Sequence, residues 1–248
     1  MKKSIGSCVV LLLTLSVASV YGQSAMTGMT VPEWSAAMTK LFGDNPTFSS
    51  TMEHQSKGGG GKDVALTGKM FYDNGKSRTE IDMKSVTSQL KPGSLEQMKA
   101  AGINLDGAAM IGRPDKKMNY GVYPEMKAYT EEAMKDPDAG KNASDFKIES
   151  TELGKETMDS HPCIKNKHLV TDKDGKQHEF IVWNATDLNK FPIRVENTER
   201  GTTSIILFKD VKLAKPDAAL FEIPSDYQRY SSMMEMMMKR MGGMMPRQ

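Results

Sequence analysis

The chain is poor in cysteine and histidine. Its 248 residues include two cysteines and four histidines. Cys8 lies in the N-terminal leader described below, so Cys163 is the only thiol expected in the mature chain. An internal disulfide is therefore excluded, and a chain of this length can bury enough core to fold without one. We expect Cys163 to be a small buried side chain, with a reactive free thiol as the alternative.

Long apolar runs are also lacking. The one at the N-terminus, Val9 to Val20, follows two lysines and is shorter than the roughly 20 residues that span a bilayer. Small residues then lead to Gly22, which completes the pattern of a secretory signal peptide cleaved after that residue. Cys8 precedes the apolar run, so a lipid anchor is not expected. The sequence predicts a bacterial protein exported to the periplasm or beyond, without a transmembrane segment in the mature chain.

Neither sign of charge is in surplus. The sequence holds 33 basic and 31 acidic residues, and loss of Lys2 and Lys3 with the leader leaves 31 of each. Proteins that bind the nucleic-acid backbone need an excess of Lys and Arg. A nucleic-acid partner is therefore not expected.

The local motifs of common catalytic sites are missing. The sequence has no Gly-x-Ser-x-Gly turn, no His-Glu-x-x-His helix and no phosphate-binding glycine loop. The run Gly58 to Gly61 lacks a following Lys-Ser or Lys-Thr, and it is expected to be an exposed connection between strands. No catalytic residue and no cofactor are predicted, and the protein is not expected to be an enzyme.

The few histidines offer one candidate metal site. Strand spacing could bring several ligands to one face from the set His161, Cys163, His168 and His178. A two-residue turn at Asp174-Gly175 would place His168 and His178 on opposite faces, whereas a three-residue loop with a bulge would place them together. We predict the two-residue turn, which disfavours this metal site.

Tight turns and alternating side chains are plentiful. Hairpins are predicted at Asn74-Gly75, Asp174-Gly175 and Arg200-Gly201, because Gly, Asn and Asp tolerate positive φ. Further strands are expected over residues 47–56, 108–112, 116–122 and 146–153, with a polar loop over 136–144. About eight to ten strands would form a mainly β (α+β) fold, a curved antiparallel sheet or half-barrel covered by two or three short helices.

Each hairpin has a predicted register. Around Asn74-Gly75, Met70 faces Thr79, and the ladder continues to Leu66 opposite Met83. Around Arg200-Gly201, one face carries Ile193, Val195, Ile206 and Phe208. Around Asp174-Gly175, both faces carry apolar residues, which predicts an interior strand pair with Ile164, Val170, Ile181 and Trp183 on one face and Leu169, Phe180 and Val182 on the other.

Capping patterns predict two short helices. One begins at Thr30 with Glu33 three residues on and ends at Gly43. The other begins at Ser94 and ends at Gly102, with Leu95, Met98 and Ala101 forming its apolar stripe.

The C-terminus is rich in methionine and predicts a third helix. A capping pattern at Ser225 and Gln228 is followed by an apolar stripe and a stop at Gly242; the stripe is Tyr227, Tyr230, Met234, Met237 and Met241. This helix is expected to pack on the sheet, to fray, or to offer a flexible surface to an apolar partner. Thioethers also suit Cu(I), and a copper site would use Met233, Met234, Met237 and Met241.

Three segments carry a family resemblance. They are Gly154-Lys155-Glu156-Thr157 with His161-Pro162-Cys163, Val182-Trp183-Asn184-Ala185 with Asp187-Leu188 and Pro192-Ile193, and Phe221-Glu222-Ile223-Pro224 with Tyr227. They resemble a bacterial exported domain family of unknown function that is similar to the Lol-type (LolA/LolB-like) lipoprotein carriers. The resemblance implies a strongly curved half-barrel whose open side is covered by helices around an apolar hollow.

The residues expected to line such a hollow are Met70, Tyr72, Ile81, Met83, Trp183, Ile206 and Phe208. Ordinary packed core is the alternative for each of them. The leading hypothesis is a non-catalytic envelope protein that binds an apolar or lipid-like ligand there. The alternatives are an interaction protein whose Met-rich helix docks on an envelope partner, and a metal-handling protein. The expected organisation is a signal peptide (1–22), a LolA-like β domain (23–228) and a Met-rich helix or tail (229–248).

Overall fold

A computed structural model of the chain describes residues 39–58, 64–86, 93–134, 146–171, 175, 177–199 and 201–242. All of them belong to the second of the two units into which the chain divides, Trp34–Gln248. The predicted signal peptide, most of the helix from Thr30 and the polar loop over 136–144 lie outside the described residues.

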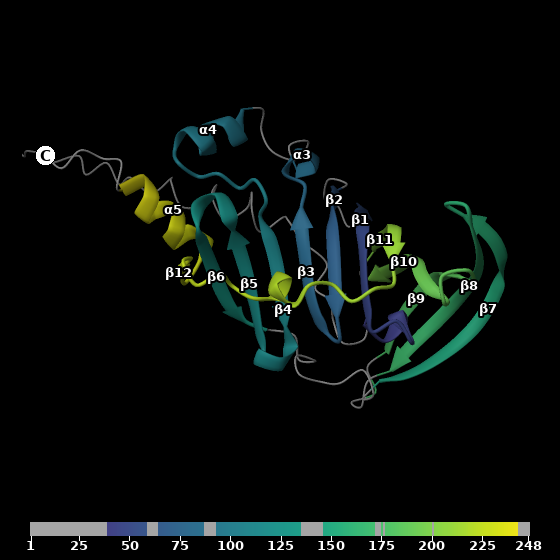
Figure 1. Cartoon of the computed structure of the whole chain (residues 1–248). Helices are drawn as coiled ribbons and strands as arrows, with labels where there is room; N and C mark the ends of the chain where they lie inside the picture. The colour runs from purple at the N-terminus through teal and green to yellow at the C-terminus, as the bar shows by residue number, and fades with distance from the viewer. Residues whose placement is uncertain are drawn as a thin grey trace, which may run out of the picture. The chain divides into compact units, whose positions relative to one another are not determined.

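Twelve strands form one open, curved sheet (Figure 1). The order across it is β12-β6-β5-β4-β3-β2-β1-β11-β10-β9-β8-β7, and the pairings are antiparallel except for β12 with β6. The strands are β1 (Thr47–Gly58), β2 (Val64–Asp73), β3 (Lys76–Ile81), β4 (Ala109–Arg113), β5 (Met118–Tyr123), β6 (Ala128–Ala133), β7 (Lys147–Met158), β8 (His161–Thr171), β9 (Gln177–Ala185), β10 (Phe191–Glu199), β11 (Thr202–Lys212) and β12 (Gln228–Tyr230). The predicted mainly β fold is confirmed, with more strands than the eight to ten expected.

The described helices are short. They are α3 (Met83–Val86), α4 (Ser94–Ala100), α5 (Met233–Gly242) and 3₁₀ turns over Lys40–Phe42, Pro114–Lys116, Pro124–Met126 and Ala218–Phe221. Helix α4 lies where the sequence predicts it, and Gly102 follows it with φ +72°. Its predicted cap is wrong, because Gly93 is the N-cap residue and no side chain bonds to the first turn. None of the described helices combines the length and the hydropathy that a membrane crossing demands.

The first and third hairpins have the predicted registers. Met70 faces Thr79 around the Asn74-Gly75 turn, and Val195 faces Ile206 in the third hairpin. The extension of the first ladder to Leu66 opposite Met83 is wrong, because β3 ends at Ile81 and Met83 begins α3. The last backbone bond of that pair runs from the N–H of Asp82 to the carbonyl of Thr67 at 2.9 Å.

The second hairpin is displaced by one residue from its predicted register. His168 faces Phe180 and Val170 faces His178, and the last described pair before the connection is Thr171 with Gln177. Val170 therefore shares a face with Phe180 and Val182, not with Trp183 as predicted. The interior position of the pair is confirmed, since β7 and β10 flank it.

The C-terminal helix begins later than its sequence pattern predicts. Ser225 and Gln228 cap nothing, because Gln228–Tyr230 forms β12 beside β6. The helix starts at Met233, where the N–H of Glu235 bonds to the hydroxyl of Ser232 at 3.1 Å. The Glu235 carboxylate forms hydrogen bonds with Lys239 and Ser231, and these bonds lower its pKa to about 2. The predicted stripe is wrong in part: Met236 is fully buried, whereas Met234 is 40% exposed.

The interior beneath β1, β2, β10 and β11 is filled by aromatic rings. Phe42 packs against four of them, with ring centroids between 4.7 and 5.9 Å apart. The cluster, called the aromatic core below, consists of Phe42, Phe48, Tyr72, Phe191 and Phe208. Since Phe42 comes from the 3₁₀ turn before β1, this turn covers the apolar face of the sheet.

A second cover crosses the sheet near β3 and β4. The C-terminal strap, residues 213–227, runs across the strands from β11 towards β12 (Figure 1). Its Phe221 is buried to 2% exposure. Arg78 donates to the carbonyl of Leu220 at 3.2 Å, and Arg113 donates to the carbonyl of Phe221 at 3.0 Å. These two arginines therefore fasten the strap to the sheet.

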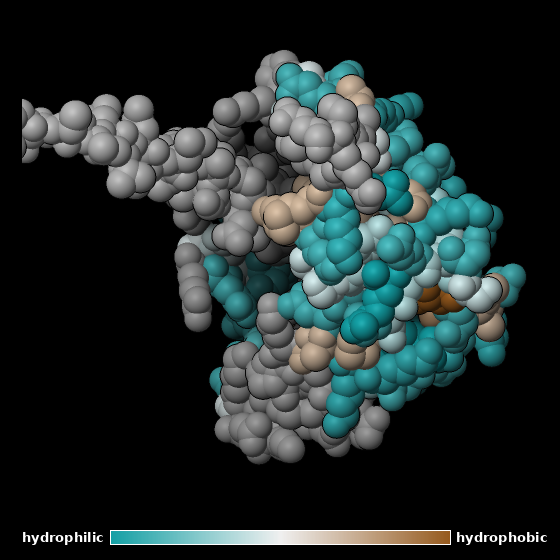
Figure 2. Space-filling view, turned by 90° about the vertical axis from the view of Figure 1, so that its left-hand side faces the viewer, coloured by the Kyte–Doolittle hydropathy of each residue, from teal (hydrophilic) through white to brown (hydrophobic). Residues whose placement is uncertain are grey.

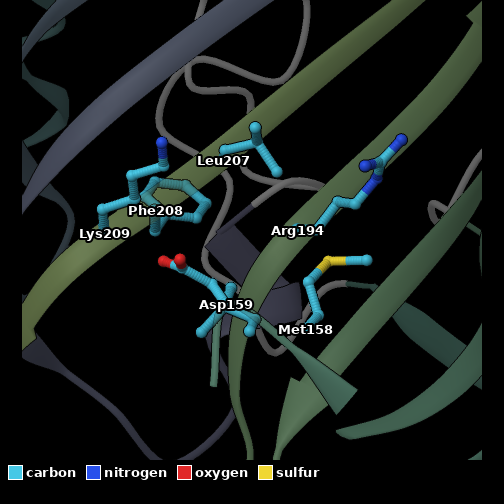
Figure 3. A pocket seen from close by; sticks show the side chains of 7 residues that line it. Met158, Asp159, Arg194, Leu207, Phe208 and Lys209 are labelled. Carbon is cyan, nitrogen blue, oxygen red and sulfur yellow. The ribbon is translucent and has the colours of Figure 1, made fainter. Parts of the chain in front are cut away.

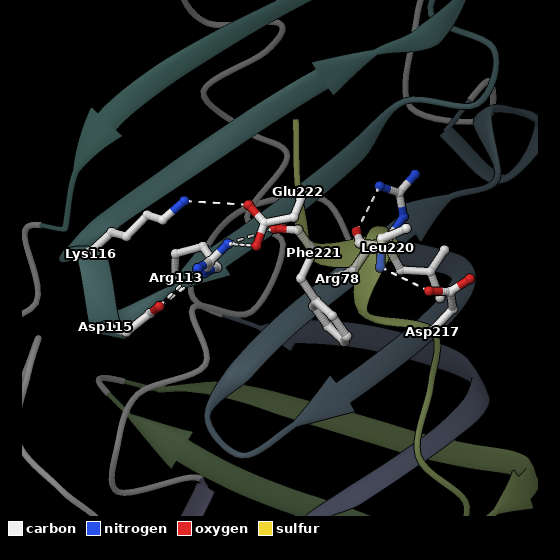
Figure 4. Close-up of polar contacts among 9 residues, drawn as sticks. Arg78, Arg113, Asp115, Lys116, Asp217, Leu220, Phe221 and Glu222 are labelled. Carbon is white, nitrogen blue, oxygen red and sulfur yellow. Dashed lines mark hydrogen bonds and ion pairs between the residues drawn. The ribbon is translucent and has the colours of Figure 1, made fainter. Parts of the chain in front are cut away.

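Arg113 also lies between two carboxylates (Figure 4). Its guanidinium is 2.8 Å from Asp115 and 2.6 Å from Glu222 of the strap. The hydrogen bonds to Asp115 and Glu222 outweigh burial and raise the pKa of Arg113. The pKa of Asp115 is lowered, first by its hydrogen bond to Arg113. Partial burial raises the pKa of Glu222, but Arg113 and Lys116 outweigh it and the net shift is downward.

These shifts predict an acid-sensitive strap. Because both carboxyls bind protons less readily when folded, their contribution to stability is present above the ordinary pKa values of 3.8 and 4.5 and is lost as pH falls below these values and through the lower folded ones. The free energy of unfolding, measured in urea at several pH values, should fall less steeply towards low pH in Arg113→Met than in the parent. Lys99→Met, which removes an exposed cation paired with Asp106, should keep the parental slope. An unchanged slope in Arg113→Met would contradict the assignment.

Candidate ligand-binding site

The structure places two of the seven residues predicted to line a hollow apart from the other five. Tyr72 and Phe208 belong to the aromatic core, and Met70, Ile206 and Trp183 belong to the same larger buried cluster. Met83 is buried in α3, outside that cluster, and Ile81 at the end of β3 is half-buried. Five of the seven are thus brought into one packed cluster, and their role as ligand contacts stays a prediction.

Trp183 does not share a strand face with Ile206. The rungs Val182–Val195 and Val195–Ile206 place Ile206 on the face of Val182, and successive residues of a strand point to opposite faces. Trp183 instead donates through Nε1 to Glu156, and two cations cover its ring at 4.5 and 4.9 Å, Lys165 and Arg194. Both faces of β9 carry apolar residues, so the sequence did not indicate which of them is continuous with Ile206.

A cavity opens beside Phe208. Its volume is about 200 Å³, and its lining residues are Met158, Asp159, Ile193, Arg194, Leu207, Phe208 and Lys209. Figure 3 shows Met158 and Asp159 opposite Leu207 and Phe208. Of the residues predicted to line a hollow, Phe208 alone is among the lining residues of this cavity. Phe208 also belongs to the aromatic core, so the cavity borders that core.

A tight turn and a β-bulge lie beside this cavity. The turn between β7 and β8 has positive φ at both Asp159 and Ser160, +49° and +69°, as a two-residue hairpin turn requires. In β10, the register with β9 shifts between Pro192 and Arg194, which is the signature of a bulge. Met158 and Asp159 of the turn and Ile193 at the bulge near the start of β10 all line the cavity.

The sequence pattern did not predict most of the residues that line the cavity. Only Phe208 was proposed, and the strand predicted over 146–153 stopped before the turn. The available signal was the pair Asp159-Ser160 between two runs that both form strands, since Asp and Ser are common turn residues. The bulge after Pro192 also had a signal, since proline within a strand is confined to edge strands, first positions and bulges.

The histidines and Cys163 have separate partners. His161 Nδ1 is 2.8 Å from Asp187, and His168 Nδ1 is 2.7 Å from the hydroxyl of Ser150. His168 and His178 do share a face, contrary to the predicted two-residue turn. Within the described ranges, however, no three His, Cys, Asp or Glu side chains are grouped closely enough to hold a metal ion.

Cys163 is buried, as expected. Burial raises the pKa of its thiol, and its Sγ donates to the carbonyl of His161 at 3.4 Å. A protonated, covered sulfur is a poor nucleophile, so the reactive-thiol alternative receives no support from its surroundings.

His54 is a polar side chain inside the apolar face. It lies between Leu66 and Ile206 on neighbouring strands and is 3% exposed. Its Nε2 is 2.9 Å from the hydroxyl of Ser204, whereas its buried Nδ1 has no hydrogen-bond partner among the residues that the structure describes. Burial lowers the pKa of His54, because charging the ring there would remove a cation from water.

We expect His54 to make the fold less stable in mild acid. Below its ordinary pKa of 6.5 the unfolded chain takes up a proton that the folded chain refuses, so stability falls as pH drops from about 7 towards 5. Burial also lowers the pKa of His168, which adds to the effect. Denaturant unfolding of His54→Gln should show a smaller loss over this interval than the parent. Equal losses in the two proteins would refute the prediction. The matched control is His161→Gln, which changes a half-buried histidine on β8.

The outer surface beside α5 and β12 is mainly hydrophilic. Figure 2 views this side, where the coloured apolar spots are small and separated. Two of the large apolar side chains exposed in the described residues belong to α5, Met234 at 40% and Met238 at 61%. Of the proposed copper ligands, Met233 and Met237 are half-buried, so the four thioethers do not all face solvent.

Comparison with known proteins gives a likeness of fold. No family model matches the sequence, and no curated protein matches it. Among solved structures, the chain is similar to a LolA superfamily protein from Nitrosomonas europaea, at 12% identity over 75% of this chain and 96% of that chain, with a TM-score of 0.37. The Mycobacterium tuberculosis lipoprotein LppX is 9% identical over 76% of this chain and 97% of that chain, with a TM-score of 0.41.

A third similar structure is MucB in complex with MucA, 13% identical over 77% of this chain and 60% of that chain, with a TM-score of 0.39. The resemblance to Lol-type carriers inferred from the sequence is confirmed as a likeness of fold. At these identities and TM-scores no residue role is carried over to this chain.

Proposed function

We propose that this chain is a non-catalytic binding protein of the bacterial envelope that holds one apolar group in the cavity beside Phe208. The supporting observation is the cavity itself, whose apolar lining comes from Met158, Ile193, Leu207 and Phe208. Apolar pockets with a few polar groups at the rim are the usual form of small-molecule sites. Export rests on the signal peptide expected over residues 1–22.

The size of the cavity limits the ligand. Pockets for drug-sized molecules measure roughly 300 to 1,000 Å³. A cavity of about 200 Å³ is smaller, and the aromatic core that bounds it at Phe208 is packed ring against ring. The ligand is therefore a single short chain or ring, or the end of a longer molecule, and not a lipid that inserts several chains.

Filling the cavity should abolish binding. Leu207 is half-buried at its edge, so the larger side chain in Leu207→Trp would occupy the space that a ligand needs. We expect at least a ten-fold weaker affinity for a neutral ten-carbon alcohol, measured by calorimetry on the mature protein. Leu213→Trp adds the same bulk at an exposed site outside the cavity and should bind as the parent does. Equal affinity in parent and Leu207→Trp would refute the proposed site.

Native mass spectrometry gives an independent test of ligand content. Protein taken from the periplasm under mild conditions should carry a small apolar adduct that organic extraction removes. The Leu207→Trp protein, prepared in parallel, should carry none. Parent protein that is consistently empty under these conditions would count against a bound cellular ligand.

A second candidate function is docking through α5. The exposure of Met234 and Met238 favours it, because flexible thioethers adapt to apolar partners. The remainder of the helix is fastened down: Met236 is buried and Arg240 donates to the carbonyl of Met126 at 2.6 Å. A docking surface here would thus be limited to the outer side of the helix.

Substitution of the two exposed methionines tests whether α5 docks on a partner. The double variant Met234→Ser and Met238→Ser should unfold as the parent does, because both side chains face solvent. Under the docking hypothesis it loses a partner that the parent retains in crosslinking from intact cells, while cavity binding is kept. Identical crosslinked partners in both proteins would exclude a role for this surface.

A further inference from the structure

The outer side of α5 presents three thioethers next to one another. Met234 is 40% exposed, Met238 is 61% exposed, and Met237 is half-buried. Helix residues three and four positions apart share a face, so Met237 and Met238 both lie beside Met234. These three residues are called the thioether face below.

The contacts of α5 keep this face turned outward. Met236 lies on the opposite side of the helix, because a turn has 3.6 residues, and it is fully buried. The first turn is capped by the hydroxyl of Ser232, and in the last turn Arg240 donates to the carbonyl of Met126 at 2.6 Å. The helix is therefore held at both ends and along its inner side.

The charged side chains of α5 have partners of their own. Glu235 accepts from the N–H and the hydroxyl of Ser231 and lies 2.7 Å from Lys239. Among the described residues, no three His, Cys, Asp or Glu side chains are grouped to hold a metal ion. Ions that prefer oxygen or nitrogen ligands thus have no such group in this part of the chain, and the thioether face offers sulfur.

Packing does not account for methionine at these positions. A side chain that stays in solvent gains little from burial, and several other residues form helices as well as methionine does. Yet methionine occupies 8 of the last 16 positions of the chain, from Met233 onward, against 21 of all 248. This enrichment favours a role for the sulfur itself.

We propose that the thioether face binds one Cu(I) ion through the Sδ atoms of Met234, Met237 and Met238. Thioethers are soft, neutral donors of the kind that selects Cu(I), and the unbranched methionine side chain lets sulfurs on adjacent turns approach one ion. Met238 was not in the ligand set predicted from sequence. The site is separate from the cavity beside Phe208 and goes beyond the proposed function.

The double variant Met234→Leu and Met238→Leu tests the site without disturbing the fold. Leucine forms helices as readily as methionine and has a similar volume, so the apolar surface stays and two sulfurs are lost. Cu(I) affinity is measured on the mature protein by competition with bicinchoninate, without oxygen and with ascorbate present. We expect one ion per parent chain and an affinity weaker by about ten-fold or more in the variant.

The pH dependence of binding identifies the ligand type. Thiol and imidazole ligands must lose a proton to bind a metal, whereas a thioether has none to lose. After correction for protons taken up by bicinchoninate, the affinity of the parent should therefore be constant from about pH 6 to about pH 8. A ten-fold weakening towards the acidic end would overturn the assignment.

Two further variants serve as controls. Met110→Leu removes a sulfur that is 38% exposed on β4, away from α5, and should bind Cu(I) as the parent does. Cys163→Ala removes the only described thiol, which is buried, and should also bind as the parent does. Loss of binding in Cys163→Ala would assign the ion to the thiol and overturn the proposal.

The remaining outcomes are equally decisive. Unchanged affinity in the double leucine variant, or a parent protein that takes no Cu(I) from bicinchoninate, would overturn the thioether site. Both proteins should bind the ten-carbon alcohol equally, because α5 does not line the cavity. Failure of the copper site therefore leaves the proposed function standing, and failure of alcohol binding leaves the copper site standing.

Discussion

The need to bury one face of a curved sheet is the constraint on which the rest of this structure depends. Antiparallel alternation sends Phe48, Met52, Met70 and Tyr72 to the same side of β1 and β2. Such a face is stable only when another layer covers it. In the part of the chain that the structure describes, the 3₁₀ turn over Lys40–Phe42 belongs to this cover, and its Phe42 touches four rings.

The C-terminal strap needs hydrogen-bond donors from the sheet on which it lies. A segment without regular pairing has backbone carbonyls that need donors when they are covered. Arg78 and Arg113 supply them to Leu220 and Phe221, and both arginines project from strands on which the strap lies. The carboxylates around Arg113 then keep its buried charge matched. The strap and β12 are therefore integral parts of the domain, although the sequence pattern favours a helix from Ser225.

Turn chemistry and side-chain pattern together determined what could be predicted from sequence. In the first and third hairpins a one-residue slip would turn apolar residues to the wrong face, so only one register is acceptable. In the second, both faces carry apolar residues, and a slip therefore incurs little penalty. The connection between Thr171 and Gln177 is longer than two residues, and the Asp174-Gly175 pattern predicted the wrong register.

The C-terminal helix and the cavity illustrate two other limits. With methionines at nearly every position from 233 to 238, several stripes fit equally well, and the packing of Met236 against the sheet decides among them. The cavity depends on a bulge at Ile193 and a turn at Asp159, which bring together residues from distant parts of the chain. Strand periodicity predicts which residues are apolar and inward, but it does not predict where the packing leaves space.

The aromatic core also limits the space that is open to the proposed ligand. A larger hollow would require the turn that carries Phe42 to leave the sheet, and exposing the rings that it covers would cost on the order of 5 kcal/mol. A ligand that opened the core would have to replace that burial. The cavity beside Phe208 requires no such rearrangement, because its volume of about 200 Å³ is already present in the structure. Under the proposed function, the size of this cavity therefore limits the ligand to one short chain or ring.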